Sequence, residues 1–72
     1  PVENLFLKFF RAAKDGEECT PMTADQVIRD LSERNRTIMR DVTRNMFGRT
    51  LNQLGMPLVR NNAYNAYRLV RI

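Results

Sequence analysis

Arginine is the residue type in this sequence that points most clearly to a binding function, because most of the arginines lie in one half of the chain. Residues 34–72 contain eight arginines and one acid, Asp41, a net charge of +7. Residues 1–33 contain four basic and seven acidic residues, a net charge of −3. The planar guanidinium group pairs bidentately with phosphate oxygens and stacks on flat rings. The asymmetry favours nucleic acid as a partner; the alternative is a solvated face that keeps a small domain soluble.

The strongest candidate contacts lie on a predicted helix that ends at Leu54. Its expected buried side consists of Met46, Phe47, Leu51 and Leu54. Its expected outward side carries the nucleic-acid-binding candidates Arg44, Asn45, Arg49, Asn52 and Gln53. Guanidinium groups pair with guanine edges or phosphates, and Asn and Gln pair with adenine. Gly48 within this helix costs roughly 1 kcal/mol relative to Ala, so either a phosphate backbone or another helix is expected to approach it closely.

A second set of candidates lies on a predicted C-terminal hairpin and on the segment before the helix. The hairpin candidates are Arg60, Asn62, Tyr64 and Arg68. Positive charge and hydrogen-bond donors suffice to bind an adjacent phosphate backbone or minor groove. Tyr64 either stacks on an unpaired base or packs on its own hairpin. Arg34, Arg36 and Arg40 are candidate phosphate clamps. If about five arginines contact duplex phosphates, log affinity should fall against log salt with a slope near −4 to −5.

Residues for catalysis, metal binding or cofactor binding are scarce. The sequence has no histidine to serve as a general base near neutral pH, and its three glycines stand apart rather than forming a phosphate-binding loop. One cysteine, Cys19, cannot form an internal disulfide, and we expect it to be a packed or idle thiol. No apolar run approaches the roughly 20 residues that a membrane span needs. We therefore expect no enzyme, no metal, no cofactor and no membrane insertion.

Helical periodicity accounts for the first half of the chain. A stripe of apolar residues predicts an amphipathic helix from Val2 to about Lys14, which Gly16 would cap. Thr23 and Gln26 have the spacing of a capping box, so a second helix should begin at Ala24. That helix runs out of apolar residues at Ser32–Arg36, where a loop or a frayed helix end is expected.

The second half predicts one more helix and a hairpin. Thr37–Val42 is compatible with a helix or an extended stretch, and the following helix is expected to be capped by Asp41 or Thr43. Gly55 and Pro57 should end it. Met56–Arg60 and Ala66–Ile72 predict two strands around an asparagine-rich turn. Three helices followed by a hairpin predict one α+β, mainly α domain over residues 1–72, with the winged helix-turn-helix arrangement.

Four segments carry a resemblance to a known group of domains: Thr23–Ile28, Asn45–Leu51, Leu54–Gly55 and Tyr67–Leu69. The sequence resembles the small C-terminal winged-helix-like domain of unknown function on primase-helicase proteins of phages, plasmids and mobile elements, including the virulence-associated E family, and most closely a bacteroidetes type. The resemblance implies a cytoplasmic role in replicating mobile DNA, with a P-loop ATPase portion upstream as a partner. It also supports Arg44, Asn45, Arg49 and Asn52 as the residues that read DNA.

Two other functions remain open on the sequence. The same fold could serve as a protein docking or oligomerisation domain, which would expose an apolar patch such as Met39, Met56 and Leu58, whereas a DNA-binding domain should expose its arginines on one contiguous face. A single-strand binder would instead present Tyr64 or Tyr67 face-out. The chain begins at Pro1, and we expect it to be the C-terminal piece of a longer protein.

Overall fold

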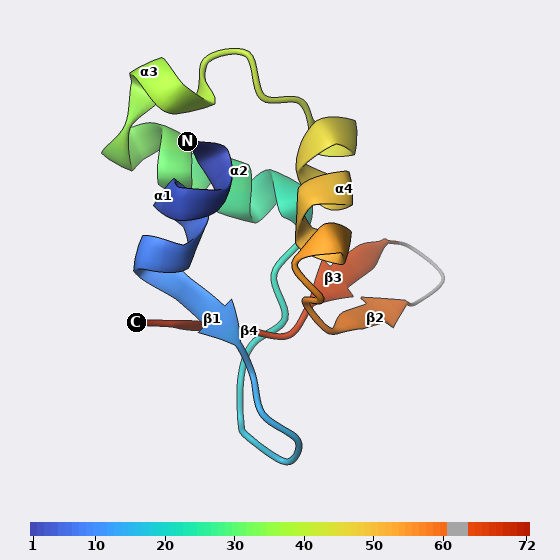
Figure 1. Ribbon diagram of the computed structural model, residues 1–72. Coiled ribbons are helices and arrows are strands. Elements are labelled where there is room, and N and C mark those ends of the chain that lie inside the picture. The colour runs from blue at the N-terminus through green and yellow to red at the C-terminus, as the bar shows by residue number, and fades with distance from the viewer. Residues whose placement is uncertain (61–63) are drawn as a thin grey trace.

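Short strands join the two ends of a mainly helical α+β domain (Figure 1). The computed structural model describes residues 1–60 and 64–72. In that part of the chain it has four helices and four strands. In order, they are α1 (Val2–Phe9), β1 (Phe10–Ala12), α2 (Ala24–Arg34), α3 (Arg36–Met39), α4 (Arg44–Gln53), β2 (Leu58–Arg60), β3 (Asn65–Tyr67) and β4 (Leu69–Arg71).

The first helix is shorter than predicted. Helix α1 ends at Phe9, and the chain turns into an extended conformation at Phe10, with φ −140° and ψ 154°. Strand β1 then pairs antiparallel with β4, with Phe10 opposite Arg71. The prediction of a helix to Lys14 is wrong because pairing with this distant strand outweighs local helical periodicity. Gly16 consequently lies in a turn of the β1–α2 loop, at φ +77°, rather than at a helix end.

Helix α2 begins where the capping box predicts. The Thr23 hydroxyl accepts a hydrogen bond from the Gln26 N–H at 3.2 Å, and the Gln26 side chain accepts one from the Thr23 N–H at 2.9 Å. The helix continues to Arg34, so the expected loop at Ser32–Arg36 is reduced to one residue, Asn35. Asn35 in turn caps the short helix α3 through its side-chain oxygen, 3.1 Å from the Ile38 nitrogen. Residues 36–39 are therefore helical, one of the two conformations that the sequence left open.

Helix α4 has clear signals at both ends. Of the two predicted caps, Thr43 is the one used: its hydroxyl accepts from the Met46 N–H at 3.2 Å. At the other end, the Gly55 N–H donates to the Asn52 carbonyl and the Met56 N–H donates to the Leu51 carbonyl, with Gly55 at φ +77°. This is the Schellman arrangement, in which a left-handed residue satisfies the last helical carbonyls.

Near the C-terminus, strands β3 and β4 follow one another and are separated by a single residue, Arg68. Before this residue, β3 pairs antiparallel with β2 and Tyr67 bridges to Met22; after it, β4 pairs with β1. Arg68 connects the two sheets through its own backbone, since its N–H donates to the Pro57 carbonyl and its carbonyl accepts from the Ala13 N–H. The predicted strand Ala66–Ile72 is therefore two strands with different partners. Of the predicted turn over residues 61–65, residues 61–63, including Asn62, lie outside the described residues, and Asn65 begins β3.

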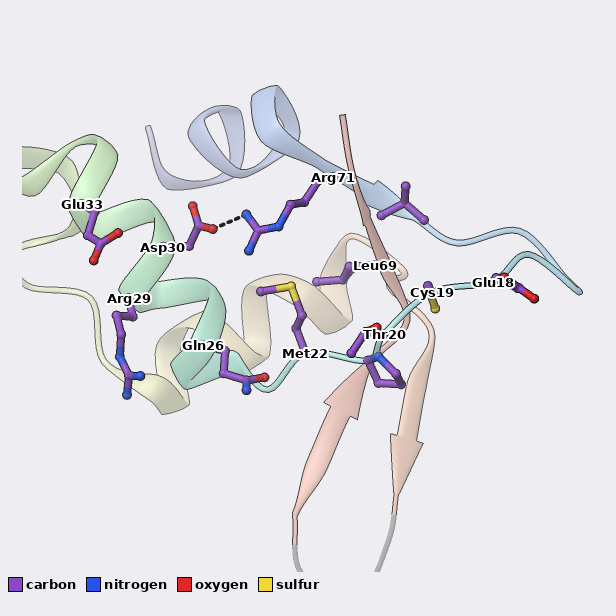
Figure 2. A pocket seen from close by; sticks show the side chains of 12 residues that line it. Glu18, Cys19, Thr20, Met22, Gln26, Arg29, Asp30, Glu33, Leu69 and Arg71 are labelled. Atoms are coloured by element: carbon purple, nitrogen blue, oxygen red, sulfur yellow. Dashed lines mark hydrogen bonds and ion pairs between the residues drawn. The ribbon is translucent and has the colours of Figure 1, made fainter.

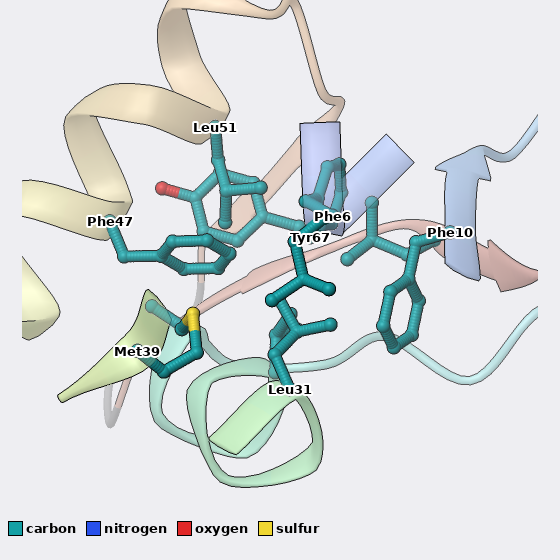
Figure 3. Packing of buried hydrophobic residues seen from close by; sticks show 11 residues of the cluster. Phe6, Phe10, Leu31, Met39, Phe47, Leu51 and Tyr67 are labelled. Atoms are coloured by element: carbon teal, nitrogen blue, oxygen red, sulfur yellow. The ribbon is translucent and has the colours of Figure 1, made fainter. Parts of the chain in front are cut away.

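A cluster of aromatic and aliphatic side chains holds the helices and strands together (Figure 3). The Phe6 ring stacks on Phe10 at a centroid distance of 5.5 Å and meets Phe47 edge-on at 5.9 Å. Leu31 and Leu51 are fully buried beside them. These contacts fix α4 against α1 and α2, and with it the orientation of the polar face of α4.

Candidate nucleic-acid interface

The outward face of α4 is set by which of its residues enter the core. Phe47 and Leu51, one helical turn apart, are fully buried, whereas the five predicted contacts Arg44, Asn45, Arg49, Asn52 and Gln53 are exposed. Met46 was predicted to be buried, but its side chain is 53% exposed. The prediction fails because the buried stripe consists of Phe47 and Leu51, followed by half-buried Leu54, and Met46 lies beside that stripe.

A groove of about 560 Å³ brings four of these five residues together with the hairpin. One wall is α4, another is the N-terminal end of α2, and the third is formed by β3 with the preceding Tyr64. The lining residues are Thr23, Ala24, Asp25, Arg44, Asn45, Gly48, Arg49, Asn52, Tyr64, Asn65 and Tyr67. Gln53 is exposed on α4 but does not line the groove.

The two groove arginines differ in their surroundings. Arg44 lies at the start of α4 and its Nη1 is 3.3 Å from Oδ2 of Asp25, at the start of α2. Arg49 forms no ion pair with any residue that the structure describes. The Arg49 guanidinium group therefore has its full hydrogen-bonding capacity available for a ligand.

Tyr67 closes the floor of the groove. The residue is 5% exposed, and its hydroxyl donates to Oδ1 of Asn52 at 3.4 Å. A Cβ on Gly48 would lie 3.8 Å from the same hydroxyl, which is an ordinary van der Waals distance. The group that approaches Gly48 within the protein is therefore this tyrosine, not another helix.

The remaining hairpin candidates do not join the groove. Arg60 is exposed at the end of β2. Arg68 is half-buried, and its Nη2 donates to the Glu17 carbonyl at 2.6 Å, in the β1–α2 loop. Asn62 lies outside the described residues. Of the four arginines expected on one face, Arg44 and Arg49 share the groove, while the Arg68 guanidinium group is turned toward the β1–α2 loop.

The three candidate phosphate clamps have different local partners. Arg34 pairs with Asp30 at 2.8 Å and lies over the Phe9 ring, 4.4 Å from its centroid. Arg40 is 3.7 Å from Asp41, with both side chains largely exposed. Arg36 is exposed and forms no ion pair in the described part of the chain.

A second pocket, of about 730 Å³, lies between α2, β4 and the segment before α2 (Figure 2). Arg71 reaches across it to Asp30, which also accepts from Arg34. Partial burial acts to raise the pKa of Asp30, but hydrogen bonds and charge from Arg34 and Arg71 outweigh burial and leave the pKa below its ordinary value. Cys19 lines this pocket as a free thiol, and among the described residues no group of three His, Cys, Asp or Glu side chains could hold a metal ion.

Several residues that line the groove were not predicted as site residues, among them Thr23, Asp25, Asn65 and Tyr67. The capping box located the start of α2, but no sequence signal indicated that this helix end faces α4. Within the described residues, no helix is long and apolar enough to cross a membrane.

The fold and the groove define a small α+β domain with a basic and amide-rich helix face. By sequence it belongs to the family DUF3874, described as a domain of unknown function from B. theta, whose model matches residues 1–69. No curated protein and no solved structure matches the chain.

Proposed function

We propose that this domain binds DNA, with duplex favoured, through helix α4 and the hairpin that follows it. The observation that carries the proposal is the groove, which gathers Arg44, Asn45, Arg49 and Asn52 from α4 and Tyr64 from just before β3. Guanidinium and amide groups on one exposed helix face suit both phosphates and base edges. The excess of arginine in the second half of the chain would add long-range attraction for a polyanion.

The order of elements supports a winged-helix reading of this domain. Along the chain, β1 follows α1 and precedes α2, and the β2–β3 hairpin follows α4 directly. In that arrangement α4 would enter the major groove and the hairpin would lie along the neighbouring backbone. We further propose a cytoplasmic role in replication or mobilisation of DNA, next to a P-loop ATPase portion of the same protein. This part rests on the resemblance to primase-helicase C-terminal domains.

The test is a fluorescence-anisotropy titration of a labelled mixed-sequence duplex and its single strand, at about 50 mM and 200 mM salt. With Arg44, Arg49 and Arg60 exposed on these elements, we expect a slope of log affinity against log salt near −3. Arg44→Ala/Arg49→Ala should weaken binding and reduce the magnitude of that slope by about 2.

Lys8→Ala/Lys14→Ala is the charge-matched control, because both lysines are exposed and neither lines the groove. Its affinity should stay close to that of the wild type. Equal losses in the two double variants would show that only net charge matters. No binding of either DNA at low salt would reject the proposal, and preference for the single strand would redirect it toward base stacking by Tyr64.

Protein docking is the second candidate, and the exposure of Met46 on α4 favours it. The apolar patch first considered is not available: Met39 is buried, and Met56 and Leu58 are half-buried against the core. If the domain docks on the ATPase portion of its parent protein, Met46→Glu should abolish that association in a pull-down.

A further inference from the structure

The groove contains one acidic side chain among its described lining residues, and that side chain is paired with a proposed DNA contact. Asp25 lies in the first turn of α2 and Arg44 in the first turn of α4, 19 positions apart in the chain. Their side chains are 54% and 72% exposed, so both can be reached from solvent. The pair therefore links the starts of two helices whose residues line the groove.

Asp25 changes the charge that a phosphate would meet. The described lining holds two cations, Arg44 and Arg49, and this one carboxylate. A carboxylate beside the groove repels phosphate oxygens, and it occupies the same Arg44 Nη1 donor that a phosphate would use. A phosphate that pairs with Arg44 through Nη1 therefore competes with Asp25 for that group.

We infer that Asp25 is an internal counter-ion that competes with DNA phosphates for Arg44 and thereby limits the affinity of the groove for DNA. This inference rests on the proposed function. Competition from Asp25 makes binding depend on more than charge. A polyanion that offers only phosphates loses part of its attraction to Arg44. A duplex that also hydrogen-bonds with Asn45 and Asn52 keeps the affinity from those two contacts.

A purely structural role for Asp25 is the competing explanation. An acid in the first turn of a helix interacts favourably with the helix dipole and stabilises the helix by a modest amount. Such a role would make Asp25→Asn less stable without making it bind DNA more tightly. Thermal unfolding of each variant, measured beside binding, separates the two roles.

The experiment compares Asp25→Asn with Asp41→Asn in the anisotropy titration at about 50 mM salt. Asp41 is the matched control, because it is an exposed acid beside an arginine, 3.7 Å from Arg40, outside the groove. We expect Asp25→Asn to bind duplex about three- to tenfold more tightly than the wild type, and Asp41→Asn at most about twofold. In an Arg44→Ala background the gain from Asp25→Asn should fall to the level of the control.

A readout without DNA tests the ion pair itself. In ¹⁵N relaxation of the Arg44 Nε–Hε group, Asp25→Asn should increase side-chain mobility and Asp41→Asn should not. Binding by Asp25→Asn that is unchanged, weaker than the wild type, or no tighter than Asp41→Asn would overturn the inference while leaving the proposed function intact. If the wild type and all variants fail to bind, the proposed function and the inference both fail.

Discussion

At the scale of single residues, the β1–α2 loop is held by one carboxylate with several donors. The Glu17 carboxylate accepts two hydrogen bonds from Arg11, at 2.9 and 2.7 Å, and one from the Lys14 N–H at 2.9 Å. The Arg11 hydrogen bond and the Lys14 backbone hydrogen bond lower the pKa of Glu17 from 4.5 to about 2, against the opposing effect of burial. The same pairing raises the pKa of Arg11.

This pairing predicts a loss of stability in acid. A carboxyl whose pKa is lower in the folded state favours folding above its unfolded pKa, and that contribution is lost as the pH falls through the folded value. We expect the free energy of unfolding to decrease between about pH 4.5 and about pH 2. In urea titrations at stepped pH, Glu17→Gln should flatten this part of the profile. Glu18→Gln, an exposed neighbour, should retain it; equal profiles for both variants would contradict the prediction.

At the scale of elements, the two glycines at α4 should respond in opposite ways to replacement by alanine. Gly48 lies inside the helix with room for a Cβ, whereas Gly55 has φ +77° just beyond the helix end. Gly48→Ala should therefore stabilise the domain, by at most about 1 kcal/mol, through helix propensity. Gly55→Ala should destabilise it by about 1–2 kcal/mol, because a side chain disfavours the left-handed conformation. Chemical denaturation measures both.

The Gly48 variant also tests how closely DNA approaches α4. If a phosphate backbone contacts the helix at this position, Gly48→Ala should weaken duplex binding in the anisotropy titration even as it raises stability. If Gly48→Ala raises both the stability and the affinity, or leaves the affinity unchanged, then no phosphate contacts α4 at Gly48.

The elements with strong local signals could be predicted, and those that depend on distant partners could not. The Thr23–Gln26 capping box and the Gly55 stop were confirmed because both are formed by residues close in sequence. Strand β1 was missed because three residues show no periodicity of their own, and their pairing partner lies at the other end of the chain. The Asp25–Arg44 pair was missed for a related reason: only the packing of α2 against α4 brings these residues together.

At the scale of the whole molecule, stability depends on a small aromatic core. For 72 residues, a typical 0.05–0.15 kcal/mol per residue corresponds to roughly 4–11 kcal/mol. Phe47 is fully buried against Phe6, and Phe47→Ala typically costs about 3–5 kcal/mol. We therefore expect this variant to be largely or partly unfolded by circular dichroism at 37 °C. Leu7→Ala, at a 44% exposed site, should melt close to the wild type.

The pairing of β1 with β4 has a consequence for the order in which the chain acquires its structure. Phe10 faces Arg71, so the small sheet closes a loop that includes nearly the whole sequence. Contacts over such separations form late, because the entropy of closing the loop must be lost before the contacts stabilise it. During synthesis, β1 would emerge from the ribosome long before its partner strand β4 exists. The domain can complete its fold only after translation has passed Arg71, and until then Phe10 lacks the strand opposite it.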